Sequence, residues 1–180
     1  MTQIMNKQLM TVGDEIKPPL ATDTKRKKKT IVFVSCLIGG NEPHGQLIVD
    51  VIKRLPSRLF ESSAIGIGAT PASDDFVAAL TGKFYSAGND REIARSILSS
   101  LRPDCVVFSE NINNPIVHFL GYERWSPIQV LLMGAPMTGG IPSIDYFLSG
   151  DRLEHVSSVA QLLFLPSMRK QSHLRTFLLY

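Results

Sequence analysis

The chain has 180 residues, of which 44% are hydrophobic and 19% are charged, so we expect one globular domain with a sizeable core. Outside the basic run at residues 25–29, 14 basic residues face 16 acidic ones, and this near-neutral balance argues against a broad nucleic-acid surface. The two cysteines show no metal-ligand spacing, and no apolar run approaches the ~20 residues of a membrane-spanning helix. We therefore expect no metal site and no membrane association.

The N-terminal residues 1–29 combine scattered polar side chains, two adjacent prolines and the basic run. Clustered positive charge repels itself and prefers solvent, so this stretch is predicted to be a disordered basic tail. A nuclear-import signal or a weak contact with a polyanion is the alternative function of the run. No secretory signal is recognisable, which predicts a cytoplasmic protein, with the nucleus left open by the basic run.

The stretch from residue 30 to residue 108 alternates between apolar runs and amphipathic segments. Strands are predicted at 31–36, 62–67 and 104–108, with a further short strand at 84–85. A helix follows the first strand, with Leu47, Ile48, Val51, Ile52 and Leu55 on one stripe. Two more helices are predicted, one capped by Asp74 and Asp75, the other capped by Asn89 and carrying on one face Ile93, Ala94, Ile97, Leu98 and Leu101.

The stretch after residue 110 continues this alternation. Asn114 and Pro115 predict the start of a helix that runs to about Glu123. A buried strand at 128–133, a glycine-rich loop at 134–140 and a short strand at 144–148 follow. Such alternation predicts a Rossmann-like three-layer α/β domain over residues 30–150, with a mostly parallel sheet and helices on both faces.

Two loops should lie at the ligand-binding edge of this sheet. Ligands bind at the carboxyl ends of parallel strands, which selects the loop at 37–45 and the loop at 134–143. The first loop is not a P-loop, because Gln46 stands where that motif needs lysine and Leu47 where it needs serine or threonine. What remains is the N-terminus of a helix, a place that favours anions.

The segment from Arg124 to Asp151 resembles the O-linked N-acetylglucosamine transferase family, including its SPINDLY-type relatives. A match of this density over about two dozen positions is far more specific than a lone glycine motif. The matching residues are Arg124, Pro127, Gln129, Val130, Gly134, Pro136, Thr138, Gly139, Ile144, Asp145 and Tyr146.

The resemblance implies an inverting glycosyltransferase built from two Rossmann-like domains, the GT-B architecture, of which this chain would be the N-terminal half. Such enzymes need no metal cofactor and transfer a sugar from a nucleotide-sugar donor to protein hydroxyl groups. We expect transfer of N-acetylglucosamine from a uridine-diphosphate (UDP) donor to serine or threonine. The expected partners are the protein acceptor, the UDP-sugar and a second domain or chain that completes the cleft.

Candidate site residues follow from the same resemblance. The family carries an Asn-His-Pro triplet in the loop after the first strand, where this chain has Asn41, Glu42 and Pro43. Either Glu42 or the nearby His44 is therefore expected to serve as the base near the acceptor. In the second loop, backbone N–H groups and a hydroxyl are expected to hold the sugar diphosphate, with Gly134, Pro136, Thr138 and Gly139 shaping the pocket.

Two departures from the family pattern favour a different function. Ala135 stands where the family usually has tyrosine or histidine, and Met133 replaces an aromatic residue. Residues 151–180 are expected to be a truncated linker-like segment, so the donor-binding second domain is missing and the chain alone is expected to be inactive. The alternative function is a non-catalytic interaction module derived from the family. An unrelated nucleotide-binding Rossmann enzyme is a third interpretation, against which the lack of a dinucleotide fingerprint counts.

Overall fold

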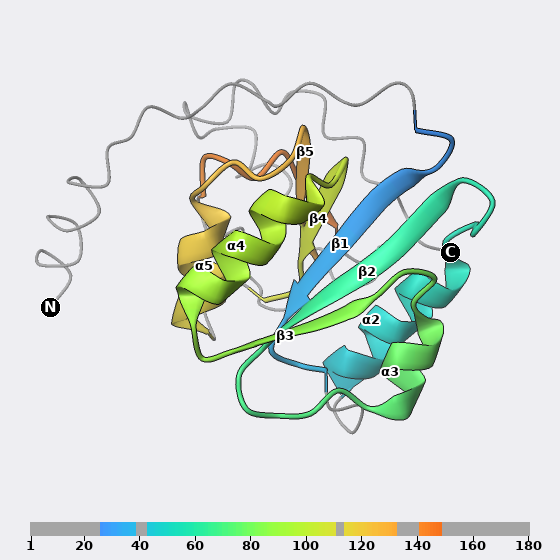
Figure 1. Cartoon of the computed structure of the whole chain (residues 1–180), viewed down its shortest axis with the longest axis horizontal. Coiled ribbons are helices and arrows are strands. Elements are labelled where there is room, and N and C mark those ends of the chain that lie inside the picture. The colour runs from blue at the N-terminus through green and yellow to red at the C-terminus, as the bar shows by residue number, and fades with distance from the viewer. Residues whose placement is uncertain (1–25, 39–42, 111–113, 133–140, 149–180) are drawn as a thin grey trace, which may run out of the picture.

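The computed structural model describes residues 26–38, 43–110, 114–132 and 141–148. Strands and helices alternate along these ranges (Figure 1). The strands are β1 (Lys29–Ser35), β2 (Phe60–Ile67), β3 (Phe84–Gly88), β4 (Cys105–Phe108), β5 (Ile128–Leu132) and β6 (Tyr146–Leu148). The helices are α2 (Pro43–Arg54), α3 (Asp74–Ala79), α4 (Arg91–Leu101) and α5 (Pro115–Gly121). None of these helices is long and apolar enough to cross a bilayer.

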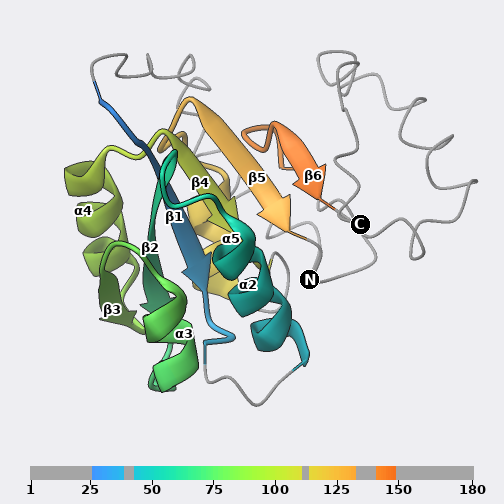
Figure 2. The ribbon, with the colours of Figure 1, turned by 90° about the vertical axis from the view of Figure 1, so that its right-hand side faces the viewer.

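The six strands form one parallel sheet in the order β3-β2-β1-β4-β5-β6. Their arrowheads point to the same edge of the sheet (Figure 2). The chain leaves β1 for β2 on one side and returns to β4 on the other, so the topological switch point lies between β1 and β4. The predicted Rossmann-like α/β fold is confirmed.

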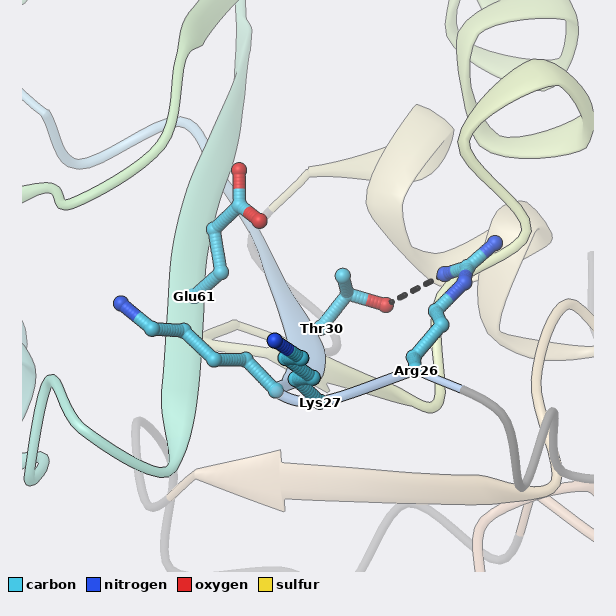
Figure 3. Close-up of a pocket in the computed structure, with 5 residues that line it drawn as sticks. Arg26, Lys27, Thr30 and Glu61 are labelled. Atoms are coloured by element: carbon cyan, nitrogen blue, oxygen red, sulfur yellow. Dashed lines mark hydrogen bonds between the residues drawn. The ribbon is translucent and has the colours of Figure 1, made fainter.

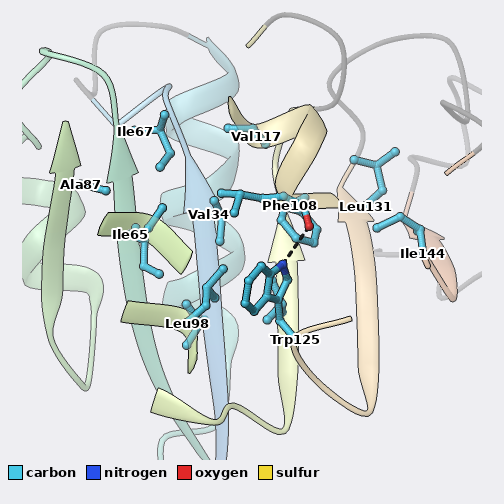
Figure 4. Close-up of a cluster of buried hydrophobic side chains, with 14 of the residues drawn as sticks. Val34, Ile65, Ile67, Ala87, Leu98, Phe108, Val117, Trp125, Leu131 and Ile144 are labelled. Atoms are coloured by element: carbon cyan, nitrogen blue, oxygen red, sulfur yellow. Dashed lines mark hydrogen bonds between the residues drawn. The ribbon is translucent and has the colours of Figure 1, made fainter. Parts of the chain in front are cut away.

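Helices cover both faces of the sheet, which makes three layers. Alternate side chains of β1 point to opposite faces, because the strand repeat is two residues. Val32 and Val34 pack on the side of α4 and α5, where Leu98 and Trp125 complete the core (Figure 4). The opposite face is packed under α2 and α3, with Phe33, Ile48, Ile52 and Phe76 at its centre. Both faces of β1 are buried, which explains its unbroken apolar run.

The helix caps differ in detail from the sequence prediction. Ser73, not Asp74 or Asp75, caps α3, because its hydroxyl accepts the N–H of Phe76 at 3.2 Å. Asp90, not Asn89, caps α4, where its carboxylate accepts from the second and third helical N–H groups. Asp74 and Asp75 lie in the first turn of α3, where their negative charges interact favourably with the helix dipole. Asn114 caps α5 as predicted.

The buried face of α4 is narrower than predicted. Ala94 and Leu98 are fully buried, and Ile97 and Leu101 pack against the same core. Ile93 is 47% exposed, so the apolar face predicted for this helix is buried only in part. Ile93 lies in the first turn of α4, at the margin of the stripe.

The basic run is partly built into the domain. β1 begins at Lys29, which pairs with Asp104 at 3.4 Å, so the last basic residue belongs to the sheet and not to a tail. Arg26 donates to the Thr30 hydroxyl at 3.1 Å beside an open hollow (Figure 3). That hollow is lined by Arg26, Lys27, Lys28, Thr30 and Glu61. It lies at the amino edge of the sheet, opposite the edge at which parallel sheets bind ligands.

Candidate functional site

Polar side chains gather at the carboxyl ends of β1 and β4, where the switch point lies. Val34 and Phe108 are partners in the last register position that joins these strands. Ser35 and Ser109, the residues that follow them, are both fully buried, and so is Glu110. These are the residue types and the place from which an α/β protein builds a site.

Glu110 is the centre of this group, and only 1% of its surface is exposed. One carboxylate oxygen, Oε1, accepts from the Ser35 hydroxyl at 3.0 Å and from the N–H groups of Cys36 and Leu37 at 2.5 and 3.0 Å. The other oxygen, Oε2, accepts from the Ser109 hydroxyl. Such charge-assisted hydrogen bonds offset the cost of burying the carboxylate.

His44 lies in the first turn of α2, beside the same group. Its Nε2 is 2.8 Å from the carbonyl oxygen of Ser109. A carbonyl oxygen can only accept a hydrogen bond, so Nε2 carries the proton. In the neutral ring Nδ1 is then the unprotonated nitrogen, the atom able to accept a proton. When neutral, His44 therefore has the tautomer in which Nδ1 is the unprotonated nitrogen.

Cys36 lies beside Glu110 and is unsuited to act as a nucleophile. Burial, reinforced by the neighbouring Glu110 carboxylate, raises the pKa of its thiol to about 12. A hydrogen bond to Asn114 opposes this shift only in part. Since the thiolate is the reactive form, Cys36 stays inert near neutral pH.

The two thiols should make stability fall in alkali. Burial raises the pKa of Cys36 and of Cys105 from 9.0 to about 12 in the folded protein. Above pH 9 the unfolded chain loses these protons while the folded chain keeps them, so the free energy of unfolding falls as pH rises to 12. Urea unfolding at pH 8, 9 and 10 measures this. Lysine and tyrosine titrate there as well, so the control is the Cys36→Ser/Cys105→Ser variant, whose decline should be shallower. An equal decline in both proteins would contradict the assignment.

A second polar cluster lies at the opposite, amino edge of β5 and contains three residues of the family resemblance. Arg124 donates to both carboxylate oxygens of Asp145, at 2.6 and 3.1 Å. The Gln129 side chain accepts from Trp125 N and donates to the carbonyls of Glu123 and Ser143. These contacts fix the join between α5, β5 and β6, so Arg124, Gln129 and Asp145 are structural residues here.

Of the predicted site residues, His44 is the one that the structure describes, and it lies at the predicted edge. The others fall outside the described residues: Asn41, Glu42, Gly134, Pro136, Thr138 and Gly139. Sequence reasoning missed Glu110 and its serine partners. An acidic residue directly after a buried apolar strand, Ser109-Glu110 after β4, was the available signal. Within the described ranges, no three His, Cys, Asp or Glu side chains are grouped to hold a metal ion.

Comparison with known proteins shows the fold. No family model matches the chain, and no curated protein matches it. Among solved structures, it is similar to a mutant of the Thermobaculum terrenum O-GlcNAc transferase, with a TM-score of 0.63 and 18% identity. The match covers 76% of this chain and 26% of that one, so this chain spans about a quarter of its neighbour's length. At this identity the likeness shows a common fold, that of part of a GT-B glycosyltransferase.

Proposed function

We propose that this chain is the acceptor-side half of an inverting protein O-glycosyltransferase. The donor would be UDP-N-acetylglucosamine and the acceptor a serine or threonine hydroxyl of a protein, in the cytoplasm or nucleus. The observation that carries the proposal is the fold likeness to an O-GlcNAc transferase. The sequence resemblance over residues 124–151 supports it, although three of its described members, Arg124, Gln129 and Asp145, have structural roles.

The reaction requires a base for the acceptor hydroxyl and a site that holds the UDP leaving group. The acceptor oxygen attacks the anomeric carbon as the bond from that carbon to the diphosphate breaks, and UDP leaves with the bonding electron pair. The hydroxyl proton passes to a base, for which we propose His44 Nδ1, at the carboxyl edge of the sheet. Glu42, two residues earlier, is the alternative base.

The leaving diphosphate is assigned to the second loop. Backbone N–H groups around Gly134 and Gly139 and the Thr138 hydroxyl would stabilise its developing charge without a metal ion. Pro136 and Asn41 complete the proposed lining. Contacts to the nucleotide would come from a second domain, on another segment or another chain, because a GT-B cleft lies between two domains. Turnover therefore requires that domain, whereas measurable donor binding does not.

Substitution of Thr138 tests this assignment. A hydrogen bond to a charged group contributes about 1.5–3 kcal/mol, so Thr138→Ala should weaken UDP-N-acetylglucosamine binding at least about tenfold in calorimetry. The control is Ser57→Ala, which changes an exposed hydroxyl between α2 and β2 at the amino edge. It should bind as the unaltered chain does. Equal affinities for all three proteins would contradict a diphosphate pocket at this loop.

A non-catalytic interaction module is the second candidate. Ala135 and Met133 favour it, because alanine can neither exchange a proton nor form a hydrogen bond where the family usually has tyrosine or histidine, and methionine replaces an aromatic residue. Measuring donor binding distinguishes the two functions. A folded chain that binds a protein acceptor and no UDP-sugar would be such a module.

A further inference from the structure

Glu110 connects the three segments that meet at the carboxyl edge. Through Oε1 it holds the backbone that leaves β1, at Cys36 and Leu37. Through Oε2 it holds Ser109 at the end of β4. The carbonyl of Ser109 in turn accepts the hydrogen bond of His44 from α2.

Burying a carboxylate at the position of Glu110 is energetically unfavourable. Removing a charge from water costs several kcal/mol, and none of the ion pairs formed within the described ranges includes Glu110. Among the residues that the structure describes, hydrogen bonds compensate this charge. An apolar side chain would fill the space without desolvating a charge, so packing does not account for Glu110.

Both the backbone N–H and the hydroxyl of Ser109 have hydrogen-bond partners among the described residues. Its N–H donates to Val34 O at 3.1 Å, and its hydroxyl lies 3.2 Å from the same oxygen and within reach of Glu110. The direction of its carbonyl is thereby set. That carbonyl decides which nitrogen of His44 carries the proton.

We infer that Glu110 is a positioning residue: it holds the Ser109 carbonyl so that neutral His44 keeps its proton on Nε2 and offers Nδ1 as the proton acceptor. The meaning of this for catalysis rests on the function proposed above. Glu110 itself, enclosed by Ser35, Ser109 and two backbone N–H groups, touches no substrate.

The test is the tautomer of His44, read by ¹⁵N–¹H NMR on the full chain. His44→Gln assigns the signals, because it removes one of four histidine patterns. We expect the Nε2–H form in the unaltered protein near neutral pH. Finding the Nδ1–H form there would overturn the inference before any Glu110 variant is made.

Three substitutions of Glu110 separate geometry from charge. Glu110→Gln keeps an oxygen for the two N–H groups and can donate to Ser109, so the Nε2–H form should be retained. Glu110→Ala removes the support and should give a mixture of tautomers. Glu110→Asp keeps the charge but is one methylene too short, so it should also give a mixture and serves if the alanine variant does not fold. Retention of the Nε2–H form in folded Glu110→Ala or Glu110→Asp would overturn the inference.

Donor binding distinguishes this inference from the proposed function. The diphosphate is assigned to the other loop, with Asn41 as the one lining residue from the loop after β1, so folded Glu110→Asp should retain most of its affinity for UDP-N-acetylglucosamine. If the His44 tautomer depends on Glu110 as expected but the chain does not bind UDP-N-acetylglucosamine, the proposed function is contradicted and the positioning role stands. If the chain binds the donor but His44 keeps its Nε2–H form in the folded Glu110 variants, the positioning role is overturned and the proposed function stands.

Discussion

Replacing Asp145 by alanine should lower the free energy of unfolding by about 3 kcal/mol, because it leaves the charge of Arg124 buried and unpaired. The Arg124 side chain is 6% exposed, and its Nε has no acceptor among the described residues. Within the described ranges, the two hydrogen bonds to Asp145 therefore compensate the burial of the Arg124 charge. Asp145 also accepts the N–H of Gln129 at 2.7 Å, a bond that the variant would lose. Urea unfolding followed by circular dichroism measures the loss.

Two further variants show which effect dominates. In Arg124→Met/Asp145→Ala both charges of this pair are removed, so most of the lost stability should return. Glu92→Ala breaks a surface pair with Arg95 in which Glu92 is 66% exposed, and the urea midpoint should not move measurably. If the double variant were as unstable as Asp145→Ala, lost packing would be the cause and the unpaired charge would not.

Replacing Phe76 by alanine should lower the free energy of unfolding by about 4 kcal/mol, the range for a buried phenylalanine. Phe76 is the one fully buried side chain of α3, and Ala79 packs partly buried against the same core. Its ring meets Phe84 edge to face, with centroids 6.4 Å apart. The cavity left by the substitution would lie between α3 and β3, and a helix of six residues depends on such packing for its stability.

The neighbouring Val77 is the matched control for Phe76. It lies on the same helix but is 44% exposed, so Val77→Ala should change stability by less than about 0.5 kcal/mol. The difference between the two variants separates packing from helix propensity. Similar losses at both positions would mean that α3 does not pack as described.

The fold could be predicted from sequence because its signals are local and repeated. Apolar runs without alternation marked β1 and β5, whose two faces are both covered by helices. Asn114 followed by Pro115 marked the start of α5 to the residue. The other caps were misplaced by one residue, because Ser73 and Asp90 compete with equally good capping residues beside them.

The candidate site was harder to predict, because its organisation depends on contacts between distant residues. Glu110 and Ser35 are 75 positions apart and meet only when β4 returns beside β1. The dense family resemblance pointed elsewhere: three of its described members, Arg124, Gln129 and Asp145, join β5 to β6 at the amino edge. In this chain these three residues hold the fold together and lie away from the candidate site.

Calorimetric titration of the full chain with UDP and with UDP-N-acetylglucosamine tests the central claim most directly. The fold likeness and the arrangement at the carboxyl edge lead us to expect saturable binding of both ligands, because the proposed diphosphate pocket belongs to this domain. Circular dichroism on the same sample establishes that it is folded. No heat at millimolar ligand from a folded sample would contradict the claim, and would leave a domain that has the fold of a glycosyltransferase half without its donor site.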